Sequence, residues 1–187
     1  LEPQNEIYFR NIKDALKNYK NLLDINELAA IYTYLHNYCF VKVDNGNLDF
    51  LNERFDIVND VISNGFHLKD GYMSPDMYIS MVTNALMLKK FKWAEDFIKS
   101  NKDHLPGEEK KSHENFAFSL YYMFSRNFDK ALEHLSRVKY KRYYDKIKIK
   151  ALNLMIFYEA GYYEEAFSQA DSFRHYISGY KTITPYI

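Results

Sequence analysis

Cysteine, proline and glycine are all scarce in this sequence. Cys39 is the only cysteine among 187 residues, which excludes disulfides within the chain and zinc sites built from several thiolates. A single thiol also favours a reducing compartment, so we expect a cytoplasmic protein. Four prolines and six glycines leave long uninterrupted stretches, which is typical of helices joined by short connections.

The sequence also lacks an excess of charge of either sign. Basic and acidic residues number 25 each, so no chain-wide electrostatic field attracts nucleic acid or anionic lipid. The longest uncharged run, from Leu28 to Val41, is shorter than the roughly 20 apolar residues that span a bilayer. We therefore expect no membrane span in this chain.

Motifs for cofactors and catalysis are missing as well. The glycines never fall at the G-x-G spacing, and none precedes a lysine, which disfavours dinucleotide and P-loop phosphate sites. His113 and Glu114 begin a zinc-protease pattern, but Ala117 occupies the position of its second histidine. We expect no cofactor, no metal and no enzymatic activity.

One pair of side chains on a predicted helix has a possible chemical use. His36 and Cys39 are three residues apart, a spacing that places a thiol and a base on one helix face. The alternative is that Cys39 is a small, inert residue buried between packed helices, and this interpretation is favoured.

What the sequence has in abundance is aromatic residues and an internal repeat. It contains 18 tyrosines and 14 phenylalanines, which suit large contacts between helices. The small residues Ala94, Ala131 and Ala166 recur 37 and 35 positions apart, each with an aromatic residue three positions earlier: Phe91, Phe128 and Tyr163. Positions three apart share a helix face, so the aromatic can pack while the alanine allows close backbone approach. Weaker copies place Leu51 and Ala15 in the alanine's position.

This pattern resembles the tetratricopeptide repeat, whose period is about 34 residues. In the best copy the matching residues are Phe157, Gly161, Tyr163, Ala166 and Phe167, and Pro106 stands where the family carries its inter-repeat proline. The tryptophan and the leucine-glycine pair of the family's first helix are absent, so the chain is described as tetratricopeptide-like.

The resemblance implies an all-α fold, a right-handed superhelix of antiparallel helix pairs with about nine helices in a single domain over residues 1–187. Helices are predicted at about 5–23, 26–43, 48–64, 75–89, 92–102, 112–126, 128–138, 144–160 and 162–178. The first helix carries only a second-helix pattern, so we expect this chain to be a fragment of a larger protein.

Function follows from the concave side of such a superhelix, which the first helix of each pair lines in the family. The resemblance predicts a mostly apolar groove that binds a protein or peptide segment, or another part of the parent chain, so that the protein acts as an interaction scaffold. The predicted groove residues are His36, Phe40, Ile79, Thr83, Leu86, His113, Phe116, Leu120, Met123, Lys148, Met155 and Tyr158.

Two alternative functions remain open. Residues 137–150 hold seven basic residues and one acid, Asp145, with interleaved tyrosines, which is a pattern of RNA and single-stranded DNA binding. The same segment also fits an inter-repeat turn with a solvated helix face, and nucleic acid is therefore the less favoured partner. The third hypothesis is a regulatory or sensor domain of a larger enzyme or transcription factor.

Overall fold

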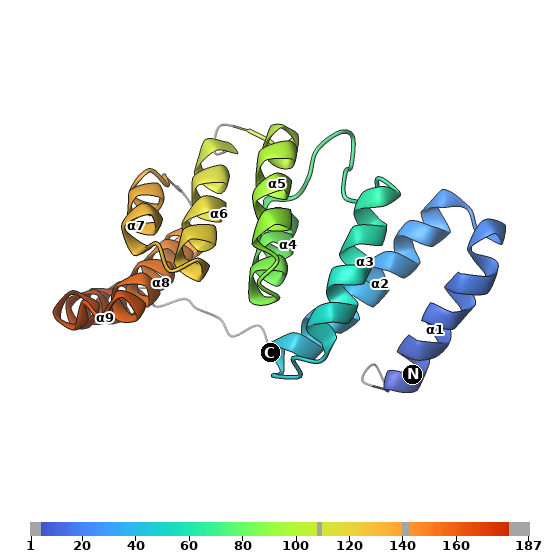
Figure 1. Ribbon diagram of the computed structural model, residues 1–187, viewed down its shortest axis with the longest axis horizontal. Helices are drawn as coiled ribbons and strands as arrows, with labels where there is room; N and C mark the ends of the chain where they lie inside the picture. The colour runs from blue at the N-terminus through green and yellow to red at the C-terminus, as the bar shows by residue number, and fades with distance from the viewer. Residues whose placement is uncertain (1–4, 108–109, 140–142, 180–187) are drawn as a thin grey trace. The chain divides into compact units, whose positions relative to one another are not determined.

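The computed structural model describes residues 5–107, 110–139 and 143–179. Within these residues it contains nine α-helices and no β-strand, which confirms the all-α prediction. The helices are α1 Glu6–Tyr19, α2 Ile25–Asp44, α3 Phe50–Ser63, α4 Pro75–Met87, α5 Phe91–Asn101, α6 Lys110–Phe124, α7 Phe128–Ser136, α8 Tyr143–Ala160 and α9 Tyr163–Ser178 (Figure 1). All nine begin and end within a few residues of the predicted positions.

The helices fall into two compact units, Leu1–Leu88 with α1–α4 and Lys89–Ile187 with α5–α9. Each unit is described by itself. The superhelix and the single domain therefore stay predictions, whereas the all-helical character and the order of the helices are established.

In the first unit, α3 packs against both α2 and α4 (Figure 1). Helix α2 begins at a capping box: the Asp24 carboxylate accepts from the backbone N–H of Glu27 at 2.9 Å, and the Glu27 carboxylate accepts from the backbone N–H of Asp24 at 2.9 Å. The core of this unit consists of side chains with almost no exposure, among them Phe9, Leu35, Cys39, Val58, Met73, Tyr78, Met81 and Val82.

Helix α1 is attached to this core by one aromatic residue and one acidic residue. The Phe9 ring is fully buried and stacks on Tyr38 of α2, with ring centroids 4.8 Å apart. At the helix surface, Glu53 of α3 accepts from Arg10 at 2.9 Å and also pairs with Lys13. These contacts place α1 beside the α2–α3 pair.

In the second unit, α6 is the central helix because it packs against α5, α7 and α8. The α6–α7 pair comes close at the second repeated alanine: the Ser119 hydroxyl donates to the backbone carbonyl of Ala131 at 2.9 Å, and Ala131 is fully buried. Because Ala131 is fully buried, a larger side chain is expected to crowd this contact. The α8–α9 pair completes this unit.

The sequence repeat has a local structural counterpart at four positions. A residue with positive φ lies five positions before each buried small or apolar residue: Gly46 (88°), Lys89 (58°), Arg126 (61°) and Gly161 (81°) precede Leu51, Ala94, Ala131 and Ala166. Three of these turns share a hydrogen bond that closes the preceding helix, from Asn47 to Lys42, from Asn127 to Tyr122 and from Tyr162 to Phe157, at 2.8–2.9 Å. This is the Schellman ending, in which one left-handed residue satisfies the last carbonyls of a helix.

Two details of the predicted repeat are wrong. Ala15 is exposed, and its neighbour Leu16 is the buried residue of α1. Tyr163 is exposed as well, although Phe91 and Phe128, in the equivalent positions, are partly buried. The small residue and the turn, rather than the aromatic residue, are thus the constant features of the repeat.

The turn residues give a pair of opposite stability predictions. Gly161→Ala is expected to lower the free energy of unfolding by about 1 kcal/mol, since a Cβ at φ 81° meets backbone strain although no atom lies within 4 Å of it. Lys89→Gly, at φ 58° and an exposed position, is expected to raise it by about 0.5 kcal/mol because it removes the same strain. Urea denaturation followed by circular dichroism measures both, and changes of equal sign would contradict this explanation of the turns.

Candidate functional site

A groove in the first unit is the best-defined candidate for a binding site. It has a volume of about 320 Å³ and is lined by α2 and α4, which both pack on α3. Helix α2 provides one wall and the first turns of α4 provide the other, with Val61 of α3 and Phe66 of the following loop between them. The lining residues are Ala29, Tyr32, Thr33, His36, Asn37, Phe40, Val61, Phe66, Asp76, Met77 and Ser80. We call this the α2–α4 groove.

The loop between α3 and α4 fixes one end of this groove. Lys69 and Tyr72 exchange two backbone hydrogen bonds of 2.8 and 2.9 Å across a turn in which Asp70 and Gly71 both have positive φ. That geometry is a type I′ turn, which an Asp-Gly pair favours. The buried side chain of Met73 then anchors the loop immediately before α4 begins at Pro75.

A buried arginine lies against two of the groove's lining residues. Arg54 on α3 is only 5% exposed. Its Nη2 donates a hydrogen bond to the Ser80 hydroxyl on α4. Its guanidinium carbon lies 5.0 Å from the centre of the Phe40 ring on α2, a cation–π contact. Arg54 therefore bridges both walls of the groove from its α3 side.

No carboxylate among the described residues forms an ion pair with Arg54, and its Nε is buried without a hydrogen-bond partner. Burial lowers the pKa of Arg54 below its ordinary value, but a guanidinium stays charged at neutral pH. A buried donor left unpaired costs about 1–3 kcal/mol, and a buried charge without a counter-charge costs more. The burial of Arg54 therefore lowers the stability of the first unit.

His36 contributes a second polar atom with no partner next to the same groove. Its Nε2 is buried without a hydrogen bond among the described residues. Burial, followed by the positive charge of Arg54, lowers the pKa of His36, so the ring is neutral at pH 7. A neutral imidazole can either donate or accept through Nε2, depending on its tautomer.

The predicted groove residues divide into three groups. His36 and Phe40 line the α2–α4 groove, and Phe40 is 45% exposed. Ile79, Thr83 and Lys148 are partly buried, while Met155 and Tyr158 are exposed on α8 of the second unit. The remaining five residues are buried: Leu86, His113, Phe116, Leu120 and Met123.

The prediction that these five residues are open to a partner is therefore wrong. Four of them lie on α6, which contacts three other helices and so buries most of its circumference. The predicted register assumes that the first helix of each pair has one solvent-exposed face. On α6, the face predicted to be exposed is buried. On α4, the residues that line the groove are Asp76, Met77 and Ser80 rather than Ile79, Thr83 and Leu86, because the groove meets only the first turns of that helix. A groove running through every helix pair stays a prediction.

The structure argues against the alternative in which Cys39 is a nucleophile. Cys39 is fully buried, and burial raises the pKa of its thiol to about 12. A thiol of that pKa is almost entirely protonated at neutral pH and is a poor nucleophile.

Thiol labelling tests this assignment directly. At pH 8 we expect an aromatic disulfide reagent to modify Cys39 of the folded chain at least about a hundredfold more slowly than in 6 M guanidinium chloride. Equal rates in the two conditions would show that the thiol is accessible in the folded protein.

Part of the basic segment 137–150 lies outside the described residues, namely residues 140–142. Several of its described cations already have partners. Arg137 pairs with Glu133 at 2.5 Å, and the Lys150 ammonium lies 5.1 Å from the Tyr176 ring centre and 3.3 Å from the Ser172 hydroxyl. Lys148 lies 3.7 Å from Asp145. These contacts favour the interpretation of this segment as a helix surface.

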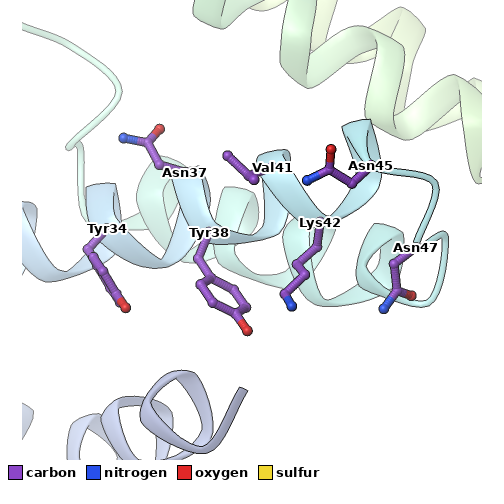
Figure 2. A pocket seen from close by; sticks show the side chains of 7 residues that line it. All are labelled: Tyr34, Asn37, Tyr38, Val41, Lys42, Asn45 and Asn47. Atoms are coloured by element: carbon purple, nitrogen blue, oxygen red, sulfur yellow. The ribbon is translucent and has the colours of Figure 1, made fainter. Parts of the chain in front are cut away.

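Another side of α2 carries a second hollow, of about 490 Å³, which shares Asn37 with the α2–α4 groove. Figure 2 shows that Tyr34, Tyr38 and Lys42 project from one side of the helix and Asn37, Val41 and Asn45 from the other, with Asn47 in the turn that follows. All of its described lining residues belong to α2 and that turn, so they provide one wall without an opposing one. An apolar cleft of about 430 Å³ lies between α1 and α2, and it contains no charged side chain among its described lining residues. Among the described residues, neither hollow is lined by a residue with a buried, unpaired polar atom, whereas His36 lines the α2–α4 groove.

Within the described residues, no cluster of histidine, cysteine and acidic side chains could hold a metal ion, and none of the helices is long and apolar enough to span a membrane. No protein-family model, curated protein or solved structure matches this chain.

Arg54 was missed in the sequence, although a signal was available. Leu51, Val58 and Val61 form a buried stripe on α3, and Arg54 occupies the position in that stripe three residues after Leu51. A charged residue at a core position of an amphipathic helix is unusual and points to a special role.

Proposed function

We propose that this protein is an interaction scaffold that binds a segment of a partner protein, or of another part of its own parent chain, in the α2–α4 groove. The carrying observation is the groove itself: α2 and α4 both pack on α3, with the exposed Phe40 on one wall and the partly buried Met77 on the other. An apolar side chain that is exposed on a concave surface gains by covering it, and methionine adapts to varied shapes.

The helical hairpins support this proposal. The same turn and a buried residue recur between α2 and α3, between α6 and α7 and between α8 and α9, and helix pairs of this kind are typical of proteins that present concave surfaces to extended or helical peptides. In the tetratricopeptide repeat, which the sequence resembles, the first helix of each pair lines the binding surface, and the predicted register makes α2 and α4 first helices. The proposal needs no catalytic residue.

Peptide selection tests the proposed function. Random 12-residue peptides displayed on phage are selected on the full chain, and the affinity of the best peptide is measured by fluorescence anisotropy. We expect the double variant Phe40→Ala with Met77→Ala to weaken binding at least tenfold, because it removes the apolar side chains of both walls.

The matched control is Met155→Ala, which removes an apolar side chain that is 51% exposed on α8 of the second unit. It is expected to leave the affinity unchanged within about twofold. Failure to select any peptide, or an equal loss in the control and the double variant, would contradict the α2–α4 groove as the binding site.

A further inference from the structure

The chemistry beside the α2–α4 groove points to one class of partner. Arg54 is 5% exposed and bears a full positive charge. The described part of the chain supplies no carboxylate that pairs with this charge. Two buried polar atoms, Nε of Arg54 and Nε2 of His36, have no hydrogen-bond partner among the described residues. A polar group of a bound segment would provide a partner for them.

The residues that carry these two atoms are both neighbours of Phe40. Arg54 contacts Ser80 and Phe40, and both of these residues line the groove. His36 lies one helical turn before Phe40 on α2 and lines the groove as well. An anionic group entering between Phe40 and Ser80 would therefore meet a guanidinium and an imidazole together.

We propose that Arg54 determines the specificity of the groove by pairing with an acidic side chain of the bound segment, a glutamate or aspartate flanked by apolar residues. The inference rests on the function proposed above. The guanidinium fork matches a carboxylate geometrically, and the surrounding apolar wall strengthens the pair by excluding water. His36, as its Nε2–H tautomer, donates to the same carboxylate.

The described polar contact of the Arg54 guanidinium is the Ser80 hydroxyl, so we assign the carboxylate to the bound segment. Asp76 is the charged residue among the described lining residues, and it lies exposed in the first turn of α4. The acidic residue that does pair with basic side chains nearby is Glu53, and its partners are Arg10 and Lys13. Glu53 is therefore already engaged at the α1 side of α3.

The test compares two peptides on two proteins. The selection on the wild-type chain of 187 residues is expected to enrich one glutamate or aspartate at a fixed distance from an apolar residue. Replacing that acid with its amide should weaken binding to the wild-type chain about thirtyfold or more, as for the loss of one partner of a buried charge pair. On Arg54→Met the same replacement should change the affinity less than about threefold, because the cation is gone.

A second measurement does not depend on a variant. The Nε–Hε signal of Arg54 in the proton–nitrogen spectrum of the wild-type chain is expected to shift when the acidic peptide is added and to stay in place with excess amide peptide. Arg10→Met is the control variant, since Arg10 is half-exposed and paired with Glu6 and Glu53; it should keep the preference for the acidic peptide.

The outcomes separate the two proposals. Selected peptides that lose affinity on Phe40→Ala with Met77→Ala but carry no acid preference would overturn the role of Arg54 and leave the proposed function standing. An acid preference that persists on Arg54→Met, with the Arg54 signal unmoved, would also overturn it. If no peptide binds the groove at all, both proposals fail.

Discussion

Arg54→Met is expected to make the protein more stable, by about 1–3 kcal/mol in the free energy of unfolding. The substitution removes a buried charge for which the described residues offer no carboxylate, together with a buried Nε that has no partner. It also removes the contact with the Phe40 ring, which is worth about 0.5–2 kcal/mol. Methionine has a similar length and retains a favourable sulfur–aromatic contact with that ring, so the loss is partly offset.

Urea denaturation measures this effect, with Arg10→Met as the matched control. Arg10 is exposed and its ion pairs with Glu6 and Glu53 lie at the surface, so its replacement is expected to change the stability by less than about 1 kcal/mol. If Arg54→Met instead lowers the free energy of unfolding by more than about 1 kcal/mol, Arg54 supports the fold, and the argument that it serves a ligand loses its basis.

Ala131→Met is expected to lower the free energy of unfolding by about 2–3 kcal/mol. Ala131 is fully buried where the Ser119 hydroxyl reaches its backbone carbonyl at 2.9 Å, so α6 and α7 would have to separate to admit a longer side chain. Ala166 on α9 is 5% exposed, so a longer side chain is expected to be destabilising there because of its burial.

Thermal or urea denaturation tests this prediction against Ser168→Met. Ser168 is exposed on α9, two residues after Ala166, and its replacement is expected to change the stability by less than about 0.5 kcal/mol. Equal stabilities of Ala131→Met and the wild-type chain would mean that the repeated alanines do not mark close helix contacts.

The extent of each helix could be predicted from the sequence because the signals for helix ends are local. Asp24 with Glu27, Pro75 and Gly161 each act within one helical turn, and the structure begins or ends a helix at each of them. The repeated small residue could be predicted as well, since its burial follows from a spacing of three dozen positions. In two of the four turns, Lys89 and Arg126 occupy the left-handed position that glycine occupies in the other two. The positions of the glycines therefore identify only two of these turns.

The groove was only partly predictable, because it depends on how many neighbours each helix has. His36 and Phe40 of α2 line the α2–α4 groove, and α2 also packs on α3. Phe116 and Leu120 occupy similar register positions on α6, but α6 has three neighbours and buries them. Sequence periodicity identifies an apolar face and does not reveal whether a second helix covers it.

The buried cation of Arg54 links the stability of the first unit to the binding specificity of the α2–α4 groove. The first unit would be more stable with an apolar residue at position 54, and the proposed gain from the arginine comes only when a carboxylate is bound. The groove would then discriminate strongly between an acidic segment and its amide counterpart, because the amide leaves the guanidinium without a counter-charge.

The most direct test is a set of intermolecular nuclear Overhauser effects between the full chain and the best selected acidic peptide. We expect contacts from the peptide's apolar side chains to the Phe40 ring and the Met77 methyl group, and contacts from the protons beside its acid to Ser80 or His36. Contacts confined to Met155 and Tyr158 on α8, with none to α2 or α4, would contradict the α2–α4 groove as the binding site.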